Sequence, residues 1–438
     1  MRHRLLSFFL FALLPGLALA VPPIQHWTLD NGARAYFVES HNLPIVDIRL
    51  TFDAGGARDG TLAGLARLTN ALLDQGNGGQ DAGEVAFRLE SVGARLSGGS
   101  ERDMAWLHLR SLTEPQALEQ AVDTLALIVG KPDFPPAAFE RERSRMLVGL
   151  QAVHQSPDEL GNRAFYRALY GNHPYGSPPD GTEESLARIE RQHVIDFYNR
   201  YYSSGNVVIA IVGAIDRAQA EALAERISGA LPQGPAAPPL PPVTPRGERH
   251  EEQVPFNSAQ THILIGQPAL KRDDEDIFAF MVGNHVLGGG GLVSLLTSTM
   301  RDKHGLSYST SSHFVPSAQP GPFVISTQVR NDSADRAIEV LREVFLDFLH
   351  NGPTPRQLEL AKRNITGGFP LNLNSNRKIV GYLSSIGFYR LPLDYLDTYL
   401  ERIEAVTAED VRRAFQRHID PDTLVIVRVG PQQEAPAQ

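Results

Sequence analysis

The segment 189-IERQHVIDFYNRYYSSGNVVIAIVG-213 has a counterpart late in the chain, 403-IEAVTAEDVRRAFQRHIDPDTLVIVRVG-430. In both, apolar residues recur at helical spacing, a polar turn follows, and a run rich in Val and Ile ends at glycine. From 194 to 213 and from 411 to 430 the two segments stay in register, with a constant offset of 217 residues. A chance similarity of two helix–strand units is the alternative, because the register match covers only 20 residues.

The beginnings of the two halves also match. The alternating stretches 46-VDIRLTFDAGG-56 and 261-THILIGQPA-269 both predict a strand that opens a sheet. Between the first and last strands the pattern is mainly helical, for example at 62–74, 82–93, 115–130 and 334–352. This order predicts an α+β fold of two tandem homologous domains, each a mainly antiparallel sheet packed with helices.

A proline-rich stretch separates the halves. The segment 232-PQGPAAPPLPPVTPRGER-249 holds seven prolines without periodicity, which is typical of an extended, semi-rigid linker. We therefore expect an N-terminal domain over 21–231, a linker over 232–249, a C-terminal domain over 250–432 and a short tail over 433–438.

The first residues have the pattern of an export signal. Arg2 and Arg4 precede an apolar run over 5–14, and Ala18-Leu19-Ala20 supplies a small-residue cleavage site. The alternative is a membrane anchor, but the run is short and is broken by a Pro-Gly pair. We expect residues 1–20 to be a cleaved signal peptide, which predicts a periplasmic protein with no stable membrane insertion.

Composition narrows the class of protein. The chain has 438 residues, no Cys and a formal charge of −9. Without disulfides its stability must come from buried cores, and this length suffices for two or more domains. No basic stripe is visible, which argues against nucleic acid as a partner.

Residue chemistry alone does not indicate an enzyme. The two histidines closest in sequence among the 14, His304 and His313, are nine residues apart, so the chain lacks the helical His pair of many zinc sites. It also lacks a Cys nucleophile, a G-x-S-x-G turn, a P-loop and a G-x-G-x-x-G fingerprint.

One helix nevertheless has the form of an active-site helix. The stretch 60-GTLAGLARLTNALLDQG-76 begins with glycines and carries an apolar stripe. Where metal ligands would be sought it offers Arg67, Asn70 and Ala71.

With these features the chain resembles the pitrilysin/insulinase family of zinc metallopeptidases, over nearly all of its mature length. The resemblance is closest to the non-catalytic subunit of bacterial heterodimeric peptidases that are similar to the mitochondrial processing peptidase. The motifs that carry it are W-x-L-x-N-G at 27–32, G-x-x-x-G-x-A at 60–66, E-R-E-R at 140–143, H-P-Y-G at 173–176, L-G-G at 287–289 and 301-RDKHGLSYS-309.

The resemblance implies that the zinc site has been lost. Active members carry H-x-x-E-H where this chain has Arg67, Asn70 and Ala71, and their third ligand, a Glu, falls on or near Gly149. Ala and Gly offer no ligand atom, and a guanidinium repels a metal ion. We therefore expect no metal and no cofactor in this chain, with the helix kept as part of a core. The plainer alternative is an ordinary core helix with Arg67 reaching into solvent.

The second half keeps other family residues. The sequence predicts a helix that ends at Gly305 and a strand that begins at Tyr308, so that Arg301 and Tyr308 flank a tight turn. In the family this Arg and Tyr reach toward the substrate at the zinc site. An Arg can hold a peptide carbonyl and a Tyr hydroxyl can donate to an oxyanion. Without the resemblance, structural roles for both residues are the alternative.

A glycine run precedes this segment. Gly288, Gly289, Gly290 and Gly291 would allow close approach of a peptide backbone and are candidate substrate-binding residues, or they form a permissive connection between helices. His173 and Tyr175 lie in a Pro/Gly-rich turn, and packing is the role we expect for them.

Together these features predict a non-catalytic subunit that forms half of a clamshell chamber with a homologous, zinc-bearing partner. Arg301 and Tyr308 would complete the partner's site, and peptide substrates would bind extended by strand addition. A non-enzymatic peptide-binding or scaffold protein is the alternative. A peptidase with a metal site rebuilt from scattered histidines is a third possibility.

Overall fold

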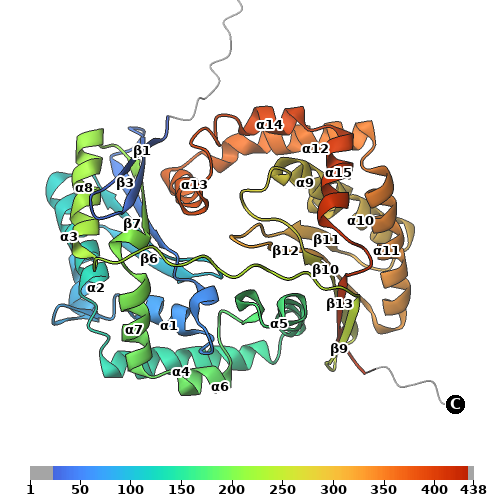
Figure 1. Cartoon of the computed structure of the whole chain (residues 1–438), viewed down its shortest axis with the longest axis horizontal. Helices are drawn as coiled ribbons and strands as arrows, with labels where there is room; N and C mark the ends of the chain where they lie inside the picture. The colour runs from blue at the N-terminus through green and yellow to red at the C-terminus, as the bar shows by residue number, and fades with distance from the viewer. Residues whose placement is uncertain (1–22, 433–438) are drawn as a thin grey trace, which may run out of the picture.

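The computed structural model describes residues 23–432, so the expected signal peptide at 1–20 and the tail at 433–438 lie outside the described range. Two main sheets, each with its own helices, face one another across the molecule (Figure 1). No helix within 23–432 is both long enough and apolar enough to span a membrane.

The first half contains a six-stranded sheet and a two-stranded ribbon. The sheet strands are β1 Gln25–Thr28, β2 Arg34–Glu39, β3 Ile45–Phe52, β6 Arg95–Ser100, β7 Ala105–Leu112 and β8 Val207–Gly213, and the ribbon is β4 Gly76–Asn77 with β5 Gln80–Asp81. Its helices are α1 Leu65–Leu72, α2 Ala82–Glu90, α3 Pro115–Gly130, α4 Pro136–Val153, α5 Pro157–Tyr170, α6 Glu183–Arg188, α7 Arg191–Tyr201 and α8 Arg217–Ala230.

The second half contains a five-stranded sheet. Its strands are β9 His250–Pro255, β10 Gln260–Pro268, β11 Thr310–Phe314, β12 Pro322–Arg330 and β13 Val425–Gly430. Its helices are α9 Ile277–Asn284, α10 Leu295–Thr297, α11 Ala334–Asn351, α12 Pro355–Gly368, α13 Asn376–Tyr389, α14 Tyr399–Ala405 and α15 Ala408–His418.

The two sheets repeat one topology. The first runs β1-β2-β8-β3-β7-β6 and the second runs β9-β13-β10-β12-β11, so the orders correspond once β1 is set aside. In each sheet the last strand of the half pairs in parallel with one neighbour, β2 or β9, and all other pairs are antiparallel. The predicted α+β duplication is confirmed, and chance similarity is excluded as its explanation.

The offset of 217 holds at the level of residues. Adding 217 to the bounds of α7 gives 408–418, which are the bounds of α15, and Gly213 and Gly430 end the equivalent strands β8 and β13. The strands predicted from these two stretches are found as β3 and β10, which lie inside the two sheets. In β3, however, burial does not alternate, because the polar residues Asp47 and Thr51 are buried together with their apolar neighbours.

One helix of each half packs on the sheet of the other half. Helix α13 of the second half packs on β2, β3 and β8, while α5 of the first half packs on β9, β10 and β13. Figure 1 shows α13 against the first sheet and α5 below the second. Apolar residues of the first sheet, such as Tyr36 and Val208, therefore belong to the core of the second half. The exchange joins the two halves through buried apolar surface.

A buried carboxylate adds a polar contact between the halves. Asp103, in the turn between β6 and β7, accepts hydrogen bonds from the hydroxyl of Tyr175 and from two groups of the second half. These are the hydroxyl of Tyr389 at 3.0 Å and the backbone N–H of Ala318 at 2.8 Å. Burial raises the pKa of both phenols, which keeps them protonated as donors. The packing role expected for Tyr175 fits this arrangement.

The proline-rich segment 232–249 contains neither helix nor strand before β9 begins at His250. It is nevertheless held in place, because Ala237 N–H donates to Asn206 Oδ1 at 3.0 Å and Gly205 N–H donates to the carbonyl of Gly234 at 3.2 Å. Further along, the carbonyl of Pro241 lies 2.9 Å from His173 Nε2. The segment crosses between the two halves as an extended strap (Figure 1).

Candidate functional site: a helix without its zinc ligands

The glycines before α1 allow the chain to adopt a backbone conformation that other residues rarely adopt. Gly60 and Gly64 have φ values of +60° and +94°, the left-handed region that glycine adopts without strain. The carboxylate of Asp59 accepts the backbone N–H groups of Gly64 and Ala66, both at 2.7 Å. It thereby satisfies donors that a helix N-terminus leaves free. This part of the family motif is therefore explained by helix capping, independently of any metal.

Asp59 itself was not singled out by the sequence analysis. It is 4% exposed, and burial raises its pKa to about 7, against the opposing effect of the two N–H donors. Asp59 lies five residues before Gly64, the N-cap of α1, so it does not have the position of an ordinary capping residue in the sequence. Its burial could not be read from the sequence.

The positions expected to have lost zinc ligands hold no suitable donor set. On α1, Arg67 points to the surface and forms an ion pair with Asp180, and Ala71 is exposed. Asn70 is buried, and its amide donates to the carbonyl of Trp106 at 3.3 Å and to the hydroxyl of Tyr202 at 3.4 Å. Gly149, on the neighbouring α4, is exposed, and a Cβ atom there would meet nothing within 4 Å.

A carboxylate on α4 does not replace them. Glu142 is buried and lies 2.9 Å from Arg145 and 3.4 Å from Arg141. A zinc ion needs three converging N, O or S donors, and here a guanidinium, a side-chain amide used in the core, a methyl and a glycine occupy the positions. Zinc therefore does not fit this part of the chain.

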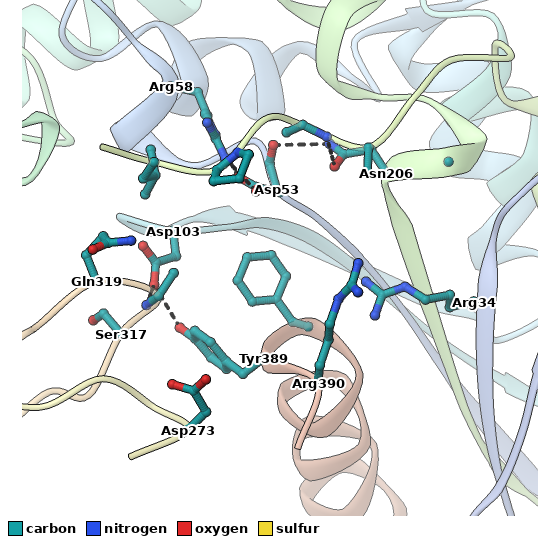
Figure 2. A pocket seen from close by; sticks show the side chains of 17 residues that line it. Arg34, Asp53, Arg58, Asp103, Asn206, Asp273, Ser317, Gln319, Tyr389 and Arg390 are labelled. Atoms are coloured by element: carbon teal, nitrogen blue, oxygen red, sulfur yellow. Dashed lines mark hydrogen bonds and ion pairs between the residues drawn. The ribbon is translucent and has the colours of Figure 1, made fainter. Parts of the chain in front are cut away.

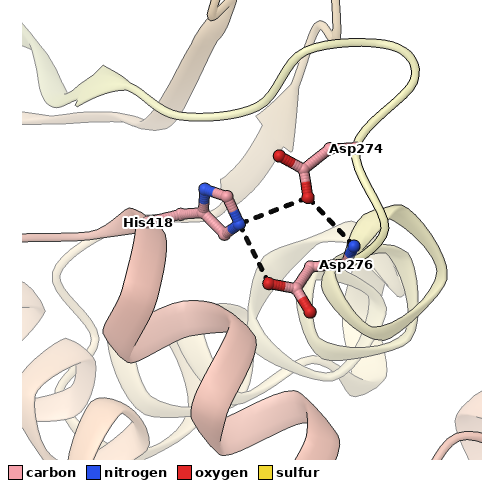
Figure 3. Close-up of side chains that lie close together, drawn as sticks. All are labelled: Asp274, Asp276 and His418. Atoms are coloured by element: carbon pink, nitrogen blue, oxygen red, sulfur yellow. Dashed lines mark hydrogen bonds and ion pairs between the residues drawn. The ribbon is translucent and has the colours of Figure 1, made fainter.

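One group elsewhere could supply metal-type ligands. Within residues 23–432, Asp274, Asp276 and His418 bring one ligand atom each within 4.8 Å of one another (Figure 3). His418 Nε2 lies 3.0 Å from Asp276 and 3.4 Å from Asp274, but Arg417 also contacts Asp276, at 2.9 Å. Because His418 and Arg417 both come from the end of α15, the group is explained as a polar contact between α15 and the start of α9.

The structure corrects the position predicted for Tyr308. The chain from Ser298 to Lys303 forms a π-helical turn, η6, and Gly305 follows with φ +61°, as expected for a helix end. Strand β11, however, begins at Thr310 rather than at Tyr308. Ser307 forms a side-chain turn with Ser309, accepting its N–H at 3.2 Å and donating to its carbonyl at 2.8 Å. This local hydrogen bonding delays the strand by two residues.

Arg301 and Tyr308 are both available to another molecule. The side chain of Tyr308 is 89% exposed and makes no hydrogen bond with the rest of 23–432. The side chain of Arg301 is 45% exposed, and its nearest acidic group is Asp302, 3.9 Å away. No hydrogen bond joins the two side chains within the described chain, so each could contact a ligand independently of the other.

Tyr308 lies at a cleft of about 380 Å³ between the halves. The cleft is lined by the start of α5 and by the polar face of β10, β11 and β12. His262 Nδ1 lies 2.6 Å from Asp158 across this junction, and Ser311 and Ser326 share a hydrogen bond of 3.2 Å on the sheet face. The cleft thus offers hydroxyl and imidazole groups to a polar ligand such as a peptide backbone.

The glycine run divides into a packed part and an exposed part. Gly288 is buried in a π-helical turn, η4 His285–Gly289, and a Cβ atom there would lie 2.3 Å from the backbone N of Ser312 in β11. A Cβ atom at Gly289 or Gly290 would lie 2.7 Å from Asn284 or His285 of the preceding turn. Gly291 has φ +67° and is followed by Leu292 and Val293, which are 68% and 87% exposed. Close packing therefore accounts for Gly288, and only the end of the run is open to a ligand.

Comparison with known proteins agrees with this architecture. Residues 35–183 match the insulinase family (peptidase family M16), and residues 188–365 match the peptidase M16 inactive domain. The crystal structure of a peptidase M16 inactive domain from Pseudomonas fluorescens is similar with a TM-score of 0.90 and 38% identity, covering 94% of this chain and 98% of that one.

Some relatives are described as peptidases and others as non-peptidases. A protein of Mycobacterium leprae (strain TN) described as an uncharacterized zinc protease is 28% identical over 403 residues, covering 88% of this chain and 86% of its own. A non-peptidase homolog of Helicobacter pylori is 24% identical over 432 residues, covering 96% and 98%. In this chain the residues at the ligand positions indicate a non-catalytic member. The duplicated fold, the capped α1 helix and the matches over both halves establish that the chain belongs to peptidase family M16, the insulinase family.

Proposed function

We propose that this chain is the non-catalytic subunit of a heterodimeric periplasmic zinc peptidase. A homologous subunit with intact H-x-x-E-H ligands would hold the zinc, and the two subunits would close as a clamshell around extended peptide substrates. The observation that carries the proposal is the contrast between what α1 keeps and what it lacks. The α1 helix keeps its cap and its packing while Arg67, Asn70, Ala71 and Gly149 supply no ligand.

The role proposed for Arg301 and Tyr308 rests on their exposure. A phenol that is 89% exposed and free of hydrogen bonds within 23–432 can donate to an oxyanion of a bound substrate. A guanidinium can hold a substrate carbonyl nearby. Leu292 and Val293 add exposed apolar surface on the same half, of a kind that marks an interaction site when residues gather there. Export through the segment 1–20 remains part of the proposal.

The test is a peptidase assay of this chain, of a homologous H-x-x-E-H chain encoded beside it, and of the 1:1 mixture. We expect activity in the mixture alone. Arg301→Ala and Tyr308→Phe should each lower kcat/KM of the mixture by roughly 10²–10³, the usual effect of removing one donor to an oxyanion. Tyr308→Phe keeps the ring, so its effect isolates the hydroxyl.

Arg363→Ala is the control, since Arg363 is an exposed arginine on α12 with a partner of its own in Glu359. This variant should leave the activity of the mixture unchanged. A partner that is equally active without this chain, or a mixture indifferent to both substitutions, would contradict the proposal. Such a result would leave a peptide-binding or scaffold protein of the same fold.

A further inference from the structure

A second pocket lies at the seam between the halves, apart from α1 and from Tyr308. It has a volume of about 260 Å³ and is closed on one side by residues of the strap, including Ala237 and Leu240. This is slightly below the roughly 300–1,000 Å³ of pockets that hold drug-sized ligands, so it suits a smaller molecule. Figure 2 shows charged side chains of both halves directed into this space.

Two arginines in the pocket lack a counter-charge. Arg34, on β2, donates to the carbonyl of Gly387 at 2.7 Å, and no carboxylate within 23–432 pairs with it or with Arg390. Burial lowers the pKa of Arg34, and the positive charge of Arg390 lowers it further, against the opposing effect of Tyr36. By contrast the third arginine, Arg58, is neutralised by Asp53 through bonds of 2.7 and 2.6 Å. Two facing cations without an acidic partner repel each other unless an anion lies between them.

Arg390 has a left-handed backbone conformation that is unfavourable for a residue with a side chain, which suggests that its guanidinium has a function. Arg390 follows α13 with φ +55° and ψ +40°, the left-handed conformation in which helices usually place Gly or Asn. Holding a larger residue there costs of order 1 kcal/mol. Figure 2 shows the guanidinium of Arg390 next to that of Arg34.

The other end of the pocket is acidic. Figure 2 shows Asp273 at the end away from the two arginines, with Tyr389 between. Asp273 has no ion pair within the described chain, whereas Asp103 is already saturated by three donors. Phe388 and Tyr389 supply aromatic surface to the same space. The pocket thus offers a cationic end, an apolar wall and an acidic end.

We propose that this pocket binds a small zwitterion with a free α-carboxylate, a dipeptide or an amino acid. The carboxylate is held between Arg34 and Arg390, the ammonium lies toward Asp273, and an apolar side chain packs on Phe388 and Tyr389. A guanidinium pair matches a carboxylate in shape as well as in charge.

The test uses the purified full-length mature chain, without any partner, and titrates glycyl-phenylalanine by calorimetry. We expect one site per chain, and at least tenfold weaker binding of the C-amidated and N-acetylated dipeptides. Arg390→Asn removes the cation while leaving a residue that tolerates the left-handed backbone, so this variant should fold normally and bind at least tenfold more weakly. Arg34→Gln should have the same effect, and Asp273→Asn should weaken the free dipeptide but not its N-acetyl form.

Arg363→Gln, an exposed arginine on α12, serves as the control and should bind like the wild type. Absence of dipeptide binding, or equal binding of the amidated form, would overturn the proposal. Inorganic phosphate that bound in place of the dipeptide would reduce the site to a simple anion site and would equally overturn the zwitterion assignment. Because the partner plays no part in this experiment, its result is independent of the proposed heterodimer.

Discussion

At the residue scale, residues that cannot bind zinc occupy the expected ligand positions on α1, and two of them form contacts of their own. Asn70, at the position where the resemblance implies a catalytic Glu in active members, donates its amide to the carbonyl of Trp106 in β7 and to the hydroxyl of Tyr202 after α7. Arg67 has gained an ionic partner in Asp180. Each substituted position is therefore either satisfied by a new contact or open to solvent, which leaves α1 free of the unpaired buried groups that would destabilise it.

Asp59 gives this helix a pH dependence. Its folded-state pKa of about 7 lies above the roughly 3.9 of an unfolded Asp, so the folded state binds more protons between these values. Its contribution to stability is therefore full below about pH 4 and is lost as the pH rises toward 7. The shift corresponds to roughly 4 kcal/mol as an order of magnitude.

Urea denaturation of the wild type and Asp59→Asn between pH 4 and 7 measures this effect. We expect the stability of the wild type relative to the variant to decrease as the pH rises. A relative stability that instead increased with pH would mean that the two N–H donors outweigh burial and that the pKa is lowered.

At the scale of elements, the helices near the two sites were predictable and their partners were not. A helix and then a strand were predictable in both 189–213 and 403–430, because apolar periodicity and strand-ending glycines are local signals, and the bounds of α7 and α15 keep the offset of 217. Periodicity says which face of α13 is apolar, but it does not say that this face covers the sheet of the other half. The delayed start of β11 depends on hydroxyl bonds at Ser307 that compete with the strand.

The exchange of α13 makes a specific prediction about its glycines. A Cβ atom at Gly387 would lie 2.5 Å from Val208 and 2.6 Å from Tyr36 of the first sheet, whereas Gly381 on the same helix has nothing within 4 Å. Gly387→Ala should therefore destabilise the protein by about 1–3 kcal/mol through overpacking. Gly381→Ala should stabilise it by about 0.5–1 kcal/mol through helix propensity.

Calorimetry of both variants checks this prediction. A single transition that moves to lower temperature in Gly387→Ala would show that α13 joins the halves into one cooperative unit. Equal effects of the two substitutions would contradict the close packing on the first sheet.

At the scale of the whole molecule, the two halves have diverged in chemistry while keeping one topology. The contacts that unite them, such as Tyr389 with Asp103 or Arg34 with Gly387, join residues 286 and 353 positions apart. Pairings at such separations leave no local pattern, which is why neither the Asp103 contact nor the seam pocket could be predicted. The positions expected to lack zinc ligands, by contrast, were predicted from a short motif, and the structure shows that three of them lie on the helix α1.

The central property proposed for this chain is that α1 is retained as structure without metal. Zinc analysis of the purified mature chain, folded in the presence of excess zinc and then dialysed, tests this claim most directly. We predict far less than one zinc per chain, unchanged by His418→Ala. One zinc per chain, lost on His418→Ala or Asp276→Asn, would contradict it and would establish a metal site rebuilt in the second half.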